Sequence, residues 1–115
     1  MKLEVGMYVR TLEGIMKVIE IKEDRAMTRF VNEDGNVYFI NDLMTNPSHN
    51  IIDLIEVGDY VNGKLVAKNE EVFTTDNIYI GRYLYEEDNS LICGEEDIKS
   101  IVTREQFEAM QYKVV

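Results

Sequence analysis

Apolar residues along this chain gather in short runs, several of which alternate with polar residues in the manner of β-strands. Six runs rich in β-branched and aromatic residues are separated by turn signals: 15–21, 27–31, 36–40, 64–73, 77–85 and 91–94. Asp34-Gly35 is a strong hairpin signal between two of them, because glycine tolerates positive φ. The pattern therefore predicts a mainly β protein.

The run NIYIGRYLY alternates most clearly. Ile78, Ile80 and Leu84 fall on one face, which Arg82 interrupts, and this face is predicted to be core. The residues on the other face either cover a junction within the protein or present a binding surface, since tyrosine is enriched at interface hot spots. They are Tyr79, Tyr83 and Tyr85.

The chain repeats itself. LEVGMYV at 3–9 and IEVGDYV at 55–61 share five of seven residues at a spacing of 52. Asp34-Gly35 and Asp88-Asn89 occupy corresponding turns at a spacing of 54, and NIID and SIVT correspond at a spacing of 50. Small changes of spacing indicate loop insertions after an old duplication.

Each half ends in a helix-capping signature, in which a side-chain oxygen accepts a first-turn N–H and a Glu or Gln returns a bond. Thr103-x-x-Gln106 predicts a helix over TREQFEAMQY, after which YKVV returns to strand character. Asp53-x-x-Glu56 predicts one turn only, because a glycine follows closely. The two halves are thus predicted to differ in the length of this helix.

About five short strands in each half, spaced by turn signals, predict a small barrel. The repeated phrase also resembles the opening of SH3-like barrels, where an apolar residue and a glycine lead into the first strand. The predicted fold is two tandem SH3-like small β-barrels from an internal duplication, 1–53 and 54–115, with a short C-terminal helix. Domains this small bury only roughly 60% of their unfolded surface, so the two barrels are expected to lean on each other.

Two segments carry a wider resemblance: SHNIIDLIEVGDYVNG and IKSIVTREQFEAMQYKV, which cover about a third of the chain. They resemble a family of small uncharacterised proteins common in phages and prophages of Firmicutes. The resemblance implies an origin in a mobile element. It transfers no catalytic residues.

Charge is the strongest signal in the composition. The chain has 12 basic and 22 acidic residues, a net charge of −10. Residues 1–54 hold 6 basic and 9 acidic residues (−3), and residues 55–115 hold 6 and 13 (−7). Such a surface repels phosphate backbones, so direct nucleic-acid binding is not expected. It confers solubility or attracts a basic partner protein.

Acidic residues of the second half gather in three predicted turns. Solvated hairpin tips are the simplest interpretation, since paired carboxylates run acid–base chemistry only where their environments separate their pKa values. Two of the groups flank one short strand, and the three together could form an acidic track that imitates phosphate spacing. The groups are Glu70 and Glu71; Glu86, Glu87 and Asp88; and Glu95, Glu96 and Asp97.

Catalytic and metal signatures are weak. His49 is the only histidine and has no ligand partner at metal-binding spacing, so we expect a turn histidine that bonds to the backbone. Cys93 is the only cysteine and is expected to be a small buried residue, since acidic neighbours raise a thiol pKa. No nucleophile motif occurs. We therefore predict no enzyme, no cofactor and no metal.

The sequence has neither an apolar run of about 20 residues nor a signal-peptide h-region, which predicts a soluble protein of the bacterial cytoplasm. The function expected is binding: a phage or prophage protein that docks an acidic, tyrosine-bearing surface on a basic host or phage protein. Its concrete version is an inhibitor of a nucleic-acid-handling defence system of the host, such as a CRISPR or restriction complex. The alternative is a structural or assembly module whose barrel edges pair with other chains, including copies of itself.

Overall fold

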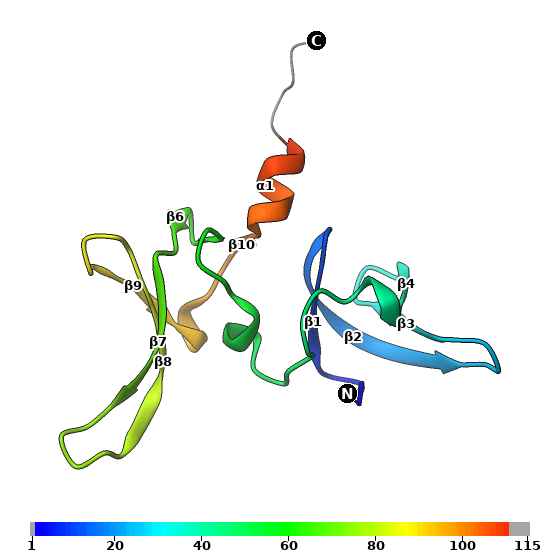
Figure 1. Cartoon of the computed structure of the whole chain (residues 1–115), viewed down its shortest axis with the longest axis horizontal. Helices are drawn as coiled ribbons and strands as arrows, with labels where there is room; N and C mark the ends of the chain where they lie inside the picture. The colour runs from blue at the N-terminus through cyan, green and yellow to red at the C-terminus, as the bar shows by residue number, and fades with distance from the viewer. Residues whose placement is uncertain (1, 111–115) are drawn as a thin grey trace, which may run out of the picture. The chain divides into compact units, whose positions relative to one another are not determined.

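A computed structural model describes residues 2–110 of the chain (Figure 1). These residues form three antiparallel sheets, short 3-10 turns and one short α-helix, so the predicted mainly β class is confirmed. The chain divides into two compact units, Met1–Leu54 and Ile55–Val115. This division falls one residue after the boundary that the sequence predicts.

The first unit is a four-stranded sheet in which each strand pairs with the next along the chain. Its elements are β1 (Tyr8–Thr11), β2 (Gly14–Glu23), β3 (Thr28–Asn32), β4 (Val37–Phe39), η1 (Ile40–Asp42) and η2 (Ile51–Leu54). Val9, Met16, Val18 and Phe30 form its buried core, and the ring of Tyr38 stacks on Phe30 with 5.5 Å between centroids. Met16 and Val18 are two apart on β2, which is the strand period that brings them to one face.

The second unit has two three-stranded sheets, in the orders β10-β5-β6 and β7-β8-β9. Its elements are β5 (Tyr60–Val61), β6 (Lys64–Leu65), β7 (Lys68–Phe73), β8 (Tyr79–Tyr85), β9 (Leu91–Gly94), η3 (Glu95–Asp97), β10 (Ile101–Val102) and α1 (Arg104–Met110). Val61 on β5 and Val66, directly after β6, are buried, and Leu84 on β8 and Cys93 on β9 are buried cross-strand partners.

The run 64–73, which the sequence predicts as one strand, is two strands that belong to different sheets. The break lies at two adjacent residues. The N–H of Val66 donates to the carbonyl of Asp59 at 2.8 Å, whereas the N–H of Ala67 donates to the carbonyl of Tyr85 at 2.8 Å. The chain therefore passes from one sheet to the other between Val66 and Ala67, whose N–H groups bond to residues of different segments.

The repeated phrase builds the same backbone turn in both units. Gly6 and Gly58 have φ angles of +94° and +100°. Glycine adopts these angles freely, whereas a residue with a Cβ would be strained in this conformation. The N–H of Gly6 donates to the carbonyl of Val18 at 2.8 Å, and that of Gly58 to the carbonyl of Val66 at 3.0 Å. The retained glycine is therefore explained by this bend, as the sequence predicted.

The hairpin turns of the two units correspond in the same way. In the first unit the N–H of Gly35 donates to the carbonyl of Asn32 at 3.0 Å. In the second the N–H of Asn89 donates to the carbonyl of Glu86 at 3.0 Å, at the predicted spacing of 54. The predicted counterpart of the first hairpin is therefore confirmed.

The second capping signature is confirmed. The N–H of Thr103 donates to Gln106 Oε1 at 2.9 Å, and the N–H of Gln106 donates to Thr103 Oγ1 at 3.2 Å, at the start of α1. The predicted end of this helix and the strand YKVV lie outside the described residues. No helix within residues 2–110 has the length and apolar character needed to cross a membrane.

The first capping signature is wrong. The short turn η2 ends at Leu54, so Asp53 lies inside it rather than before it. The N–H of Glu56 donates instead to Asp59 Oδ2 at 2.7 Å. The signature predicts that the Glu56 N–H donates to the Asp53 side chain, but the carboxylate of Asp59 accepts this N–H instead.

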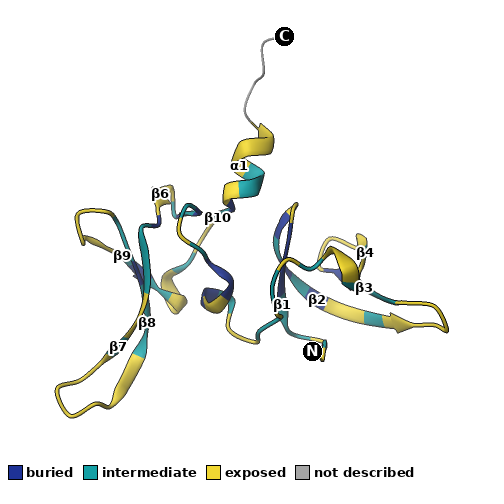
Figure 2. Cartoon of the chain, viewed as in Figure 1, coloured by how far each residue is buried: buried dark blue, intermediate teal, exposed yellow. Residues whose placement is uncertain are grey.

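Of the aliphatic residues that the alternation of 77–85 assigns to the core, only Leu84 is buried. Leu84 is fully buried, as predicted, but the exposed fractions of Ile78 and Ile80 are 63% and 52%. The prediction fails there because β9 pairs with β8 only over Tyr83–Tyr85. The other end of the β7–β8 hairpin extends past that strand (Figure 2).

Candidate functional site

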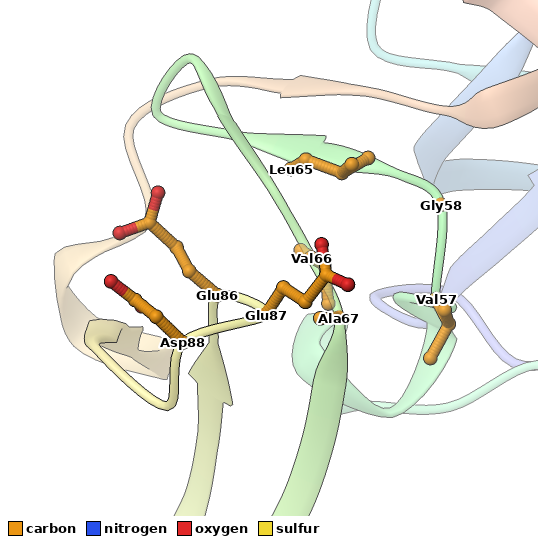
Figure 3. A pocket seen from close by; sticks show the side chains of 8 residues that line it. All are labelled: Val57, Gly58, Leu65, Val66, Ala67, Glu86, Glu87 and Asp88. Atoms are coloured by element: carbon orange, nitrogen blue, oxygen red, sulfur yellow. The ribbon is translucent and has the colours of Figure 1, made fainter.

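The pocket that brings acidic residues together lies in the second unit and has a volume of about 500 Å³ (Figure 3). One side is the segment that runs from the repeated phrase through β6, and the other is the turn between β8 and β9. Figure 3 shows the side chain of Glu87 extending from that turn toward the segment that carries Val66. The pocket is lined by Val57, Gly58, Leu65, Val66, Ala67, Glu86, Glu87 and Asp88.

Backbone hydrogen bonds fix the acidic turn. The N–H of Glu86 donates to the carbonyl of Ser90 at 2.8 Å, and the N–H of Ser90 donates to Asp88 Oδ1 at 2.9 Å. Asn89 takes a φ of +69°, a left-handed conformation that asparagine tolerates better than most residues. The turn therefore holds three successive carboxylates on a defined backbone.

Hydrogen bonds in the turn favour the ionised form of the Asp88 carboxyl group. Hydrogen bonds from the Ser90 side chain and then from the Ser90 backbone lower the pKa of Asp88 below its ordinary value. Accepted hydrogen bonds favour the charged form of a carboxylate. Asp88 thus keeps its negative charge at the rim of the pocket at any physiological pH.

The opposite wall of the pocket is apolar and accessible. The exposed fractions of Val57 and Leu65 are 56% and 46%, whereas Val66 behind them is buried. The sequence does not predict this wall, because the repeated phrase indicates only the opening of a strand. Val5, which corresponds to Val57 in the first copy, is also exposed, at 58%.

Carboxylates facing apolar groups suit one kind of ligand group. The stems of lysine and arginine pack on apolar surface while their charged ends remain hydrated or meet carboxylates. The wall of Val57 and Leu65 would contact the stem, and Glu86, Glu87 and Asp88 would receive the cation. The arrangement contains no buried acid–base pair.

The third acidic group lies where the sequence places it. Glu95, Glu96 and Asp97 form η3, directly after β9, while the 86–88 group lies in the turn directly before that strand. The prediction that the two groups flank one short strand is confirmed. Asn62 anchors η3, because its Nδ2 donates to the Asp97 carbonyl at 3.0 Å. The η3 carboxylates do not line the pocket.

Glu70 and Glu71 lie on β7 and differ in their surroundings. Glu71 faces Arg82 across the strand pair and forms an ion pair with it at 2.8 Å. Glu70 is exposed and lies opposite Tyr83. The negative charge expected at this pair is therefore neutralised at Glu71, and Glu70 remains exposed.

The three tyrosines differ in exposure. Tyr83 and Tyr85 are half-buried, and the ring of Tyr83 covers Gly94, where an added Cβ would lie 2.9 Å from Tyr83 Cε1. Tyr79 is 55% exposed and contacts Phe73, with 5.5 Å between ring centroids. Tyr83 therefore packs within its own sheet, and Tyr79 is the tyrosine that presents most of its ring to solvent.

Other candidate residues have structural surroundings. His49 Nε2 lies 3.0 Å from Glu4 Oε2, so its partner is a carboxylate and the predicted backbone bond is not what the structure shows. Cys93 is buried, as predicted; burial first and Asp97 second raise the pKa of its thiol. Within residues 2–110, no three His, Cys, Asp or Glu side chains are placed to hold a metal ion.

Comparison with known proteins gives no match: no family model, no curated protein and no solved structure is similar to this chain. The assignment to SH3-like barrels and the resemblance to phage and prophage proteins stay predictions.

Proposed function

We propose that this protein is a non-enzymatic binding module that docks the acidic surface of its second unit on a basic partner protein. The observation that carries the proposal is the pocket in which Val57 and Leu65 face the acidic turn Glu86–Asp88. A lysine or arginine side chain of the partner fits this combination, with its stem on the apolar wall and its charge at the carboxylates.

Charge favours the same kind of partner over a wider surface. Residues 55–115 carry a net charge of −7, from 6 basic and 13 acidic residues. Complementary charge accelerates encounter and discourages wrong partners more than it adds affinity. The acidic residues around the pocket would therefore steer a basic protein toward it and keep nucleic acid away.

The broader proposal is a pair of tandem SH3-like barrels from an internal duplication, of phage or prophage type, acting in the cytoplasm of a bacterial host. The hydrogen bonds that recur at Gly6 and Gly58 support the duplication. The resemblance to phage and prophage proteins and the net charge of −10 support an inhibitor of a nucleic-acid-handling defence system. The acidic surface would occupy a site that the host protein uses for phosphates.

A charge-matched pair of variants tests the docking proposal. Partners are recovered from a bacterial lysate, identified by mass spectrometry and purified, and their affinity for the chain is measured across salt concentrations. E86Q with E87Q is expected to weaken binding about tenfold or more and to flatten its salt dependence. The control, E20Q with E23Q, makes the same change in net charge on β2 of the first unit. Equal effects of the two pairs would mean that overall charge, and not the pocket, determines binding.

An assembly module is the second candidate, favoured by the part of β8 that has no strand on its outer side. β9 pairs only with Tyr83–Tyr85, which leaves residues 79–82 of β8 without a second neighbouring strand among the described residues. Free edges of this kind pair with other chains. Self-association that survives high salt, seen by sedimentation velocity, would favour assembly over charge-driven docking.

A further inference from the structure

The end of the β7–β8 hairpin carries an exposed apolar surface that the pocket does not use. We call residues 73–80 the hairpin end. Figure 2 shows it exposed, in contrast to the part of β8 near β9. The exposed fractions of Phe73, Ile78, Tyr79 and Ile80 lie between 49% and 63%. Four neighbouring large apolar residues at this exposure mark an interaction site rather than a solvated loop.

The hairpin end is ordered by its own hydrogen bonds. The N–H of Thr74 donates to the carbonyl of Ile78 at 2.8 Å, and the N–H of Asn77 donates to the carbonyl of Thr74 at 2.9 Å. Thr74 Oγ1 in turn accepts the N–H of Ile78 at 3.1 Å. A surface already held in shape loses less conformational entropy when it binds.

Strand pairing past β9 offers a second mode of recognition. Residues 79–82 of β8 lie beyond the register that β8 shares with β9, and a register shift within them leaves Ile80 without a partner on β7. An extended peptide can add a strand to such an edge, with main-chain hydrogen bonds for affinity and alternate side chains for specificity. Ile80 and Tyr79 lie on this segment, so the free edge and the apolar surface coincide.

The charge of the hairpin indicates whether its partner is a second copy of this chain or a different protein. Residues 69–81 contain three acidic residues and no basic one: Glu70, Glu71 and Asp76. The next residue, Arg82, neutralises Glu71 at 2.8 Å, so Glu70 and Asp76 carry the unbalanced negative charge of the hairpin. A second copy would bring the same negative hairpin to the interface, and the whole chain carries −10. The occupant that complements this surface is basic.

We propose that the hairpin end binds an extended basic segment of the partner protein, in which apolar side chains alternate with lysine or arginine. The segment adds a strand along residues 79–82 of β8. Its apolar side chains pack on the exposed apolar residues of the hairpin end that share their face of the sheet, and its basic side chains face Glu70 and Asp76. This inference rests on the proposed docking on a basic partner and names the partner's recognised segment.

Two synthetic peptides of about nine residues test this mode of binding: one alternates lysine with leucine, the other lysine with serine. The full chain is expected to bind the Lys-Leu peptide about tenfold more tightly than the Lys-Ser peptide. I78S with Y79S should remove that preference and leave Lys-Ser binding unchanged. The control, L12S with V37S, removes similarly exposed apolar residues from the first unit and should keep the preference. Circular dichroism melts confirm that each variant is folded.

The outcomes separate this inference from the proposed function. If E86Q with E87Q weakens both peptides while I78S with Y79S changes neither, the hairpin inference is overturned and docking at the pocket stands. If I78S with Y79S removes the preference for the Lys-Leu peptide while E86Q with E87Q changes the binding of neither peptide, the inference stands and the pocket is not the docking site. An absence of Lys-Leu binding overturns the inference. So does sedimentation showing that I78S with Y79S converts a dimer to a monomer, because the occupant would then be a second copy.

Discussion

The buried carboxylate of Asp59 accepts a hydrogen bond from the backbone N–H of Arg104 at 2.9 Å, 45 residues further along the chain. The same carboxylate accepts the N–H of Glu56 at 2.7 Å, and its residue is fully buried. Asp59 stands where the first copy of the repeated phrase has Met7. One residue that differs between the copies thus ties the start of α1 to the repeated turn.

Replacing Asp59 with asparagine is expected to destabilise the second unit by about 2–4 kcal/mol, since asparagine keeps one acceptor oxygen but places an NH2 group against the other buried N–H donor. Urea unfolding followed by circular dichroism measures the free energy of unfolding. D76N is the control, because Asp76 lies in the exposed β7–β8 turn and should change stability by less than about 0.5 kcal/mol. Similar losses in both variants would contradict the role given to Asp59.

The two glycines of the repeated phrase form a matched pair for a second prediction. Both have positive φ, so G6A and G58A should each cost about 1–2 kcal/mol through backbone strain. An added Cβ at Gly6 has nothing within 4 Å, whereas one at Gly58 lies 3.2 Å from Arg104 Cδ. G58A is therefore expected to lower the melting temperature more than G6A. The extra loss should shrink when R104A is combined with G58A, and an unchanged difference would show that Arg104 is not its cause.

Much of this local structure follows from the sequence. The turn residues of the two hairpins bond to residues only a few positions away, and so do Thr103 and Gln106. Their sequence patterns therefore predict the local structure directly. Asp59 acts on a residue 45 positions distant, and no local pattern shows that. The exposure of Ile80 likewise depends on where β9 stops pairing, which the alternation of β8 alone does not reveal. The pocket needed both the acidic turn, which was predicted, and an apolar wall from another segment, which was not.

Tyr38 and Glu13 give a prediction for alkaline pH in the first unit. The hydroxyl of Tyr38 donates to Glu13 Oε2, and this bond, with burial next, raises the pKa of Tyr38 to about 12. Because the folded pKa lies above the ordinary value of 10.0, the stabilisation is complete below pH 10 and is lost as pH rises toward 12. E13Q should lower the pKa of Tyr38, as seen by NMR titration of labelled tyrosine rings. Y38F removes the titration and serves as its assignment control.

Asp88 should keep its charge, and its part in docking, in more acidic solution than an ordinary aspartate would. Hydrogen bonds from Ser90 lower the pKa of Asp88 below 3.8, so the carboxylate protonates only at a pH below that of an ordinary aspartate. S90A removes the side-chain bond, which is the larger cause, and should raise the pKa of Asp88 in an NMR titration. Affinity for the Lys-Ser peptide should then be lower than that of the unmodified chain near pH 4 and equal to it at pH 7, because Asp88 is ionised in both at neutral pH. Equal affinities at both pH values would show that Asp88 does not take part in docking.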